Sequence, residues 1–305
     1  MLRRLLVLTL FAAVTLLSGQ QKDLDDLKLT VDVDLVQVPV SVVDKHGFPV
    51  PGLRREHFIV YEDKVLQNLS LFTHEDIPLS VSLVLDASGS ILQMQDKLNA
   101  AAMTFIRESN PQDETSIVSF GEEVFLEQPL TSNREKLSSA LAGISLTDST
   151  AFYDAVFLAI KHLENDASME KKVIIVISDG EDNRSKQDFS SVLKELRKSK
   201  VALYSIGLVN SAQYGLGVQN GKKFLKQLAE VNGGASFFPK DISEFEAICK
   251  RIAHDLRNQY TIGYRPSNTK MDGSWRKIDI KLKPPPNTPK VSVRNKQGYY
   301  ARVMQ

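Results

Sequence analysis

The stretch LVLDASGSIL, residues 83–92, decides the fold of this chain, because an apolar run ends there abruptly in polar side chains. A continuous apolar run bounded in this way indicates a strand that is buried on both faces, as in parallel sheets. Asp86, Ser88 and Ser90 follow directly, so one carboxylate and two hydroxyls reach one place with no basic residue beside them. These residues alone leave three interpretations open: serine chemistry, a metal site, or the capping of a helix.

The segment around this stretch alternates between apolar runs and helical periodicity. Buried strands are predicted at Ser80–Leu85, Ser116–Phe120, Val173–Ile177 and Ala202–Leu208, with an edge strand at Val124–Pro129. Helices are predicted at Ile91–Arg107, Ala151–Leu163, Phe189–Arg197, Phe224–Val231 and Ile242–Asn258. Strands that alternate with helices predict a doubly wound, Rossmann-like α/β domain with a mainly parallel sheet.

Both ends of the chain have a strand pattern and no helical period. LTVDVDLVQVPVSVVD alternates apolar and polar residues near the N-terminus, and QYTIGYRP and WRKIDIKLK do so near the C-terminus. Because a sheet of two or three strands is marginal alone, we expect the two ends to form one small β-sandwich around the inserted α/β domain. Two separate β appendages are the alternative. The predicted domains are residues 21–77 (β), 78–258 (α/β) and 259–305 (β).

Residues 1–20 have the order of a secretory signal peptide. Arg3 and Arg4 precede a mainly apolar run from Leu5 to Leu17, and the small residues Ser18 and Gly19 follow it. That run is shorter than the roughly 20 residues of a spanning helix, which favours a signal over a permanent anchor. We therefore expect an exported protein, periplasmic or extracellular, with no membrane span after signal removal.

Composition excludes several classes of protein. The 305 residues are 42% hydrophobic and 25% charged, as in ordinary globular proteins, and the net charge of +1 gives no case for nucleic-acid binding. Cys249 is the only cysteine, which excludes an internal disulfide and a cysteine zinc site. It lies in a segment of helical period, where a buried core position is predicted.

A second carboxylate, Asp179, and a threonine, Thr150, also stand at the ends of predicted elements, as Asp86 does. The apolar run KVIIVIS ends at Asp179, and Thr150 stands directly before a predicted helix. In doubly wound sheets, ligands bind beyond the carboxyl ends of the strands, at the point where the connections diverge. The D-x-S-x-S pattern is weak alone, but its position at a strand end makes the combination more specific. We expect five residues to converge at this edge: Asp86, Ser88, Ser90, Thr150 and Asp179.

With these residues in view, the chain resembles a von Willebrand factor type A (VWA) domain over about residues 79–255. The five residues are similar to the metal-ion-dependent adhesion site of that family. STAFYDAV resembles the family's threonine segment, with Phe152 where leucine is usual, and VVDKHGFPVPGLRREHFIVYED and NQYTIGYRP resemble a secreted bacterial VWA-related family. The resemblance implies that the five residues hold a metal, with Asp86 and Asp179 acting largely through coordinated water.

The residue types fit that implication. Mg²⁺ is a hard, six-coordinate cation that takes oxygen ligands, and Mn²⁺ fits the same set. A metal held mainly by neutral hydroxyls stays electron-poor, so a carboxylate can complete its shell. We therefore expect a non-enzymatic adhesion module that binds an Asp or Glu of a partner protein through the metal. The alternative is a scaffold or assembly factor of an envelope complex, in which the β-sandwich carries the contacts and the metal is structural.

Two rival explanations use the same residues. A serine hydrolase would need a G-x-S-x-G elbow, but Asp86 stands where the first glycine belongs, and nothing places a histidine beside Ser88. Alternatively, Ser88 and Ser90 cap a helix starting near Ile91, and Asp179 is a turn residue. Glu181 and Asp182 extend the second loop, where a solvated loop is favoured over an acidic rim that tunes partner choice.

Overall fold

The computed structural model describes residues 35–91, 94–208, 216–283, 285–286, 288 and 290–303, with backbone alone for Ser90, residues 216–218 and Ile242. Residues from Leu35 onward belong to one compact unit. The predicted signal peptide lies outside the described residues. Within them, no helix has both the length and the apolar character that crossing a membrane requires.

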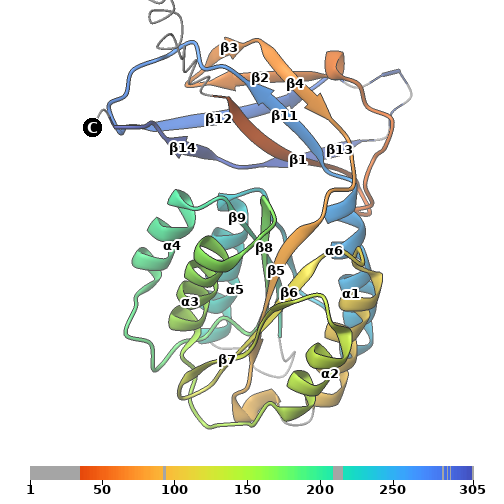
Figure 1. Ribbon diagram of the computed structural model, residues 1–305, viewed down its shortest axis with the longest axis vertical. Coiled ribbons are helices and arrows are strands. Elements are labelled where there is room, and N and C mark those ends of the chain that lie inside the picture. The colour runs from red at the N-terminus through yellow and green to blue at the C-terminus, as the bar shows by residue number, and fades with distance from the viewer. Residues whose placement is uncertain are drawn as a thin grey trace, which may run out of the picture. The chain divides into compact units, whose positions relative to one another are not determined.

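A six-stranded sheet forms the centre of the α/β part, in the order β10–β9–β8–β5–β6–β7 (Figure 1). All neighbours are parallel except β6 and β7, which are antiparallel. Every residue of β5 is buried, as expected for a strand covered on both faces. The strands are β5 (Leu79–Asp86), β6 (Glu114–Phe120), β7 (Val124–Thr131), β8 (Lys171–Ser178), β9 (Val201–Gly207) and β10 (Ser236–Phe237). The predicted fold class is confirmed.

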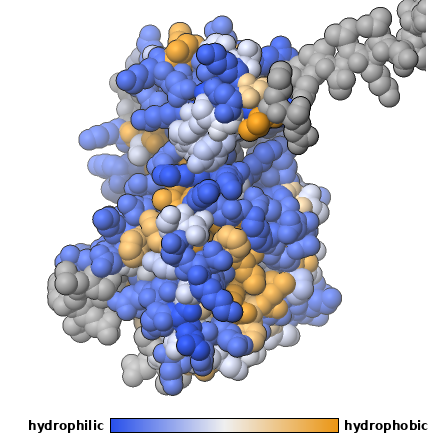
Figure 2. All heavy atoms as spheres, turned by 90° about the vertical axis from the view of Figure 1, so that its left-hand side faces the viewer, coloured by the Kyte–Doolittle hydropathy of each residue, from blue (hydrophilic) through white to orange (hydrophobic). Residues whose placement is uncertain are grey.

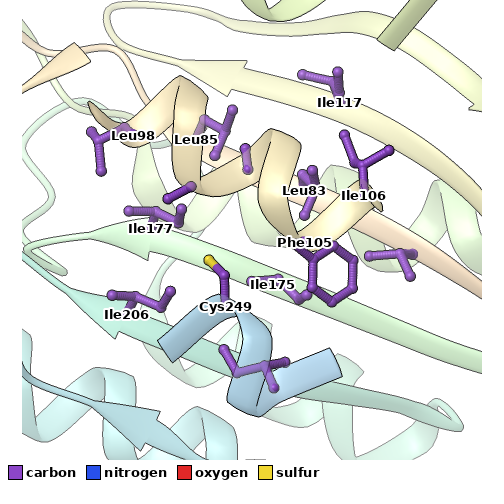
Figure 3. Close-up of a cluster of buried hydrophobic side chains, with 14 of the residues drawn as sticks. Leu83, Leu85, Leu98, Phe105, Ile106, Ile117, Ile175, Ile177, Ile206 and Cys249 are labelled. Atoms are coloured by element: carbon purple, nitrogen blue, oxygen red, sulfur yellow. The ribbon is translucent and has the colours of Figure 1, made fainter. Parts of the chain in front are cut away.

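Three helices cover each face of this sheet. One face carries α1 (Gln95–Glu108), α2 (Arg134–Gly143) and α6 (Phe245–Arg257). The other carries α3 (Phe152–Asp166), α4 (Phe189–Lys198) and α5 (Leu216–Val231). Figure 3 shows the first core, where Cys249 of α6 lies among the aliphatic side chains of the sheet and α1. Cys249 is almost fully buried in this core, so its predicted core position is confirmed, and the burial raises the pKa of its thiol to about 12.

Half-buried apolar side chains lie at the outer side of the second core. Figure 2 shows apolar side chains gathered over the lower, helical half of the face that carries α3 and α4, between hydrophilic ones. Phe157, Leu158, Phe189 and Leu193 are half-buried there and pack on the core beneath. Burying one side of such a residue on the core is ordinary packing for an outer helix.

The two ends of the chain form two antiparallel four-stranded sheets, ordered β13–β1–β11–β4 and β14–β12–β2–β3. Each sheet combines strands from before and after the α/β part. Phe58 and Tyr260 meet between the sheets with ring centroids 5.2 Å apart, in one shared core. The strands are β1 (Val36–Asp44), β2 (Phe58–Glu62), β3 (Val65–Gln67), β4 (Leu69–Thr73), β11 (Tyr260–Tyr264), β12 (Trp275–Leu282), β13 (Val291–Asn295) and β14 (Gly298–Tyr300).

Buried polar contacts connect the strands after α6 to the α/β part. Asp255 at the end of α6 accepts hydrogen bonds from Arg294 of β13 and from the hydroxyl of Tyr204 in β9, both at 2.6 Å. Gln259 donates to the Tyr204 hydroxyl at 3.2 Å and to the Ser41 hydroxyl of β1 at 3.0 Å. Because all of these groups except the half-buried Arg294 are almost fully buried, losing one partner would leave another unsatisfied.

Several element boundaries differ from the prediction. The helix predicted from Ile91 begins at Gln95, because Gly89–Ile91 forms a 3-10 turn first. Helix α2 was not predicted, since only Leu137 and Leu141 are buried on it and two apolar residues make a weak period. Helix α5 starts at Leu216, well before its apolar stretch, and KVSVRNKQGYYA forms two strands that belong to different sheets. Further 3-10 turns lie at Arg55–His57 and Ile242–Glu244.

Candidate metal centre

Two of the predicted residues lie at the same edge of the central sheet. In the parallel register of β5 and β8, Leu85 pairs with Ile177, so Asp86 is beside Ser178 and Asp179 follows directly. The connection after β5 runs through α1 on one face, and the connection after β8 runs through α4 on the other. This is the point of a doubly wound sheet at which ligands bind.

The carboxylate of Asp86 is buried, at 2% exposure, and held on both oxygens. Its Oδ1 accepts from the backbone N–H of Ser88 at 2.9 Å, and its Oδ2 accepts from the Ser178 hydroxyl at 2.8 Å. The same hydroxyl accepts from the backbone N–H of Gly180 at 3.0 Å, which connects the loop after β8 to Asp86. Ser178 was missed in the sequence, although a polar residue ending an apolar strand is a usable signal.

The loop before α3 is bonded to both other loops. Thr147 forms a parallel bridge with Ser88, and its N–H donates to the carbonyl of Ala87 at 2.8 Å. Thr150, 8% exposed, donates its N–H to Asn183 Oδ1 at 2.9 Å and accepts from the N–H of Asn183 at 3.0 Å. These bonds bring Asp86, Ser88, Thr150 and the loop of Asp179 together. The side chain of Ser90 lies outside the described residues. Asn183 had no predicted role.

Two glycines allow other segments to approach these loops closely. A Cβ added at Gly121, in the turn after β6, would lie 1.7 Å from the hydroxyl oxygen of Thr147. A Cβ added at Gly221, in α5, would lie 2.3 Å from the carbonyl oxygen of Asp179. A side chain at Gly121 would therefore displace the side chain of Thr147, whereas a side chain at Gly221 would displace the backbone of the loop that holds Asp179.

The two carboxylates are close to each other and have no cationic partner. No ion pair among the described residues involves Asp86 or Asp179. Burial raises the pKa of Asp86, and burial together with the charge of Asp86 raises the pKa of Asp179 to about 6. A bound cation would offset this unfavourable pair, so the residues fit a metal.

The donors available to such a metal are mainly neutral. Within the part of the chain that the structure describes, no three His, Cys, Asp or Glu residues cluster in a metal-binding arrangement. Two carboxylates with the hydroxyls of serine and threonine are a hard oxygen set, which suits Mg²⁺ or Mn²⁺ better than a soft metal.

Capping of α1 does not account for Ser88, which stands directly before a 3-10 turn instead. The residue before α1 is Met94, and no side chain caps that helix end. Ser88 lies ahead of the 3-10 turn, where its carbonyl accepts from the N–H of Ile91 at 3.1 Å. His162 pairs with Asp166 at 2.8 Å and His74 stacks on Tyr260, so neither serves as a base for Ser88 in this arrangement.

A sequence profile of the von Willebrand factor type A domain matches residues 80–251, more than half of the chain. The chain belongs to the VWA domain family. The match agrees with the resemblance inferred from the sequence and confirms it. A comparison with curated proteins found no match.

Solved structures share the VWA fold at low identity. A von Willebrand factor type A protein from Catenulispora acidiphila is 11% identical, with a TM-score of 0.52, covering 88% of this chain and 74% of that chain. Proximal thread matrix protein 1 from the mussel byssus, solved with a zinc-occupied MIDAS motif, is 16% identical, with a TM-score of 0.49 and coverage of 64% and 49%. The vWF domain of the type V pili tip protein Mfa5 from Porphyromonas gingivalis is 12% identical, with a TM-score of 0.48 and coverage of 58% and 95%.

Proposed function

We propose that this chain is an exported, non-enzymatic protein-binding module whose VWA domain captures an acidic side chain of a partner protein through a divalent metal. Membership of the VWA family supports a protein-interaction role. The residues proposed to hold Mg²⁺, or Mn²⁺, are Asp86, Ser88, Ser90, Thr150 and Asp179. The observation that carries the proposal is a pair of carboxylates at the switch point of the sheet, the buried Asp86 and the half-buried Asp179, with no ion pair to either among the described residues.

Each group has a distinct task in this proposal. Ser178 and the N–H of Ser88 orient the carboxylate of Asp86, so its position does not depend on a ligand. Asn183 holds Thr150 against the loop of Asp179. When bound, the metal would supply an open coordination position and a positive charge for an incoming carboxylate. Export is supported by the signal-like residues 1–20.

The test is calorimetric titration of Mg²⁺ and Mn²⁺ into the protein, with excess acetate as a stand-in for the partner's carboxylate. Asp86→Asn should abolish binding, because the neutral amide neither attracts the cation nor accepts the Ser178 bond in the same way. Asp279→Asn on β12, an exposed position at 56%, is the matched control and should bind as the wild type does. Equal Mg²⁺ affinity of Asp86→Asn and Asp279→Asn would refute the proposal. Absence of Mg²⁺ and Mn²⁺ binding by the wild type, even with acetate, would refute it as well.

A second function is favoured by the surface of the β-sandwich. The adjacent residues Val65 and Leu66 of β3 are exposed by 54% and 60%, and Phe48, in the loop after β1, is exposed by 59%. In a scaffold or assembly factor these side chains would carry the contacts, and the metal would be structural. Partner capture that survives Asp86→Lys but is lost in Leu66→Lys would favour this function over adhesion.

A further inference from the structure

Two exposed carboxylates stand beside the candidate metal centre on different loops. The Oδ1 of Asp148 would lie 3.5 Å from a Cβ added at Gly89, so this carboxylate is next to the D-x-S-x-S loop. The exposed Glu181 follows Asp179 closely, and its N–H donates to Asp179 Oδ1 at 2.9 Å. Taken alone, Glu181 fits a solvated loop. Asp148 and Glu181 flank the candidate centre on two loops, and we refer to the part of the surface that they form as the entrance to the centre.

The nearby basic residues do not balance this charge. Arg184 donates to Glu122 Oε1 at 3.1 Å, so these two exposed charges offset each other. Glu123 adds another exposed carboxylate in the same turn. Lys186 is also exposed, but it lies farther along the loop toward α4, with its backbone N–H bonded to Asp154 of α3 at 2.9 Å. On α5, Lys222 lies over the ring of Phe238, with its Nζ 4.7 Å from the ring centroid. The loops before α3 and after β8 therefore keep more exposed carboxylates than bases.

This excess of negative charge repels the acidic side chain that the proposed function requires as a ligand. Asp86 and Asp179 would offset part of the charge of a divalent ion, so an incoming carboxylate drawn to the metal would also meet the repulsion of Asp148 and Glu181. Exposed charge pairs change affinity by about two- to fivefold each. A positive side chain next to the acidic one would reverse the sign of that effect, since it would lie against the same two carboxylates.

Resting on the proposed function, we infer that the partner presents an acidic residue flanked by Lys or Arg. The acid goes to the metal, and the flanking base contacts Asp148 and Glu181. The charge pattern of the entrance thus selects among acidic partner segments, favouring mixed-charge segments over purely acidic ones.

The test compares two peptides with blocked ends, Gly-Gly-Lys-Asp-Lys-Gly-Gly and Gly-Gly-Ser-Asp-Ser-Gly-Gly, titrated into the full chain with Mg²⁺ or with EDTA. In Mg²⁺ at low salt, we expect the lysine peptide to bind at least about fivefold more tightly, the combined effect of two exposed charge pairs. Glu181→Lys and Asp148→Lys should each remove most of that preference. Glu170→Lys, an exposed position before the amino end of β8, makes the same change of charge at the other edge of the sheet and should keep the preference.

The outcomes separate this inference from the proposed function. Equal Mg²⁺-dependent binding of both peptides overturns the role of the flanking base but leaves the metal-dependent capture of an acid in place. Equal binding of the lysine peptide in Mg²⁺ and in EDTA overturns the inference as well, because attraction to an acidic surface then suffices. Absence of Mg²⁺-dependent binding for both peptides overturns the inference and the proposed function together.

Discussion

Replacing Gly221 by alanine should damage the metal centre, although alanine is the better helix former. Alanine in a helix interior is favoured over glycine by about 1 kcal/mol. Here, however, the added Cβ would lie 2.3 Å from the Asp179 carbonyl oxygen and 3.1 Å from the Gly180 carbonyl carbon, and Cβ contacts under 3.0 Å essentially never occur. The backbone of Asp179 must therefore move, because no flexible side chain is available to give way.

The magnitude follows from that shift. Restoring a contact of 3.0 Å from one of 2.3 Å moves Asp179 by roughly 0.7 Å, more than the ~0.5 Å within which a binding constellation must be held. Overpacking costs about 1–3 kcal/mol, so the clash should outweigh the helix propensity and the net change should be a destabilisation of about 1 kcal/mol. Affinity for Mg²⁺ should fall by about tenfold or more, as for other changes next to metal ligands.

Thermal unfolding in EDTA and calorimetric titration of Mg²⁺ measure the two effects separately. Gly143→Ala is the matched control, since a Cβ at that position in α2 meets nothing within 4 Å. It should keep the stability and the Mg²⁺ affinity of the wild type, or increase the stability slightly. A Gly221→Ala protein that is as stable as Gly143→Ala and binds Mg²⁺ equally well would show that the packing of α5 does not position Asp179.

Three more changes test other contacts. Ser178→Ala removes a hydrogen-bond donor from the buried Asp86 and should lower Mg²⁺ affinity by about tenfold in the same titration. Unchanged affinity would mean that the hydroxyl does not orient the carboxylate. Arg294→Met removes the cation that pairs with the buried Asp255 and should lower the free energy of unfolding by about 3–5 kcal/mol, measured with denaturant. Adding Asp255→Leu should restore part of that free energy. A decrease below about 1 kcal/mol in Arg294→Met would contradict the reasoning. Burial lowers the pKa of Lys171 to about 8, so between pH 8 and its unfolded value of 10.5 the unfolded chain binds more protons and stability should rise with pH. Lys171→Met should lack this increase in the free energy of unfolding, which is on the order of 2 kcal/mol. Parallel pH profiles of stability for the variant and the wild type would refute the role of Lys171.

The distance along the sequence between interacting residues explains why some residues of the candidate site could be predicted and others could not. Asp86 ends β5 and Asp179 directly follows β8, and strand ends are visible in a local pattern of hydrophobicity. Ser178 and Asn183 owe their roles to partners far along the chain. The Ser178 hydroxyl reaches Asp86 across 92 residues, and Asn183 reaches Thr150 across 33. No local pattern specifies such bonds.

The sequence by itself determined the α/β class and the positions of most strands and helices, because the period of buried side chains differs between a strand and a helix and is written in consecutive residues. It also determined which oxygen donors follow the strands. Only the tertiary structure decided that β8 lies beside β5, that β13 and β14 join different sheets, and that α5 presses on Asp179 through Gly221. These features depend on which elements become neighbours, and neighbours are selected by packing and hydrogen bonding between segments distant in the chain.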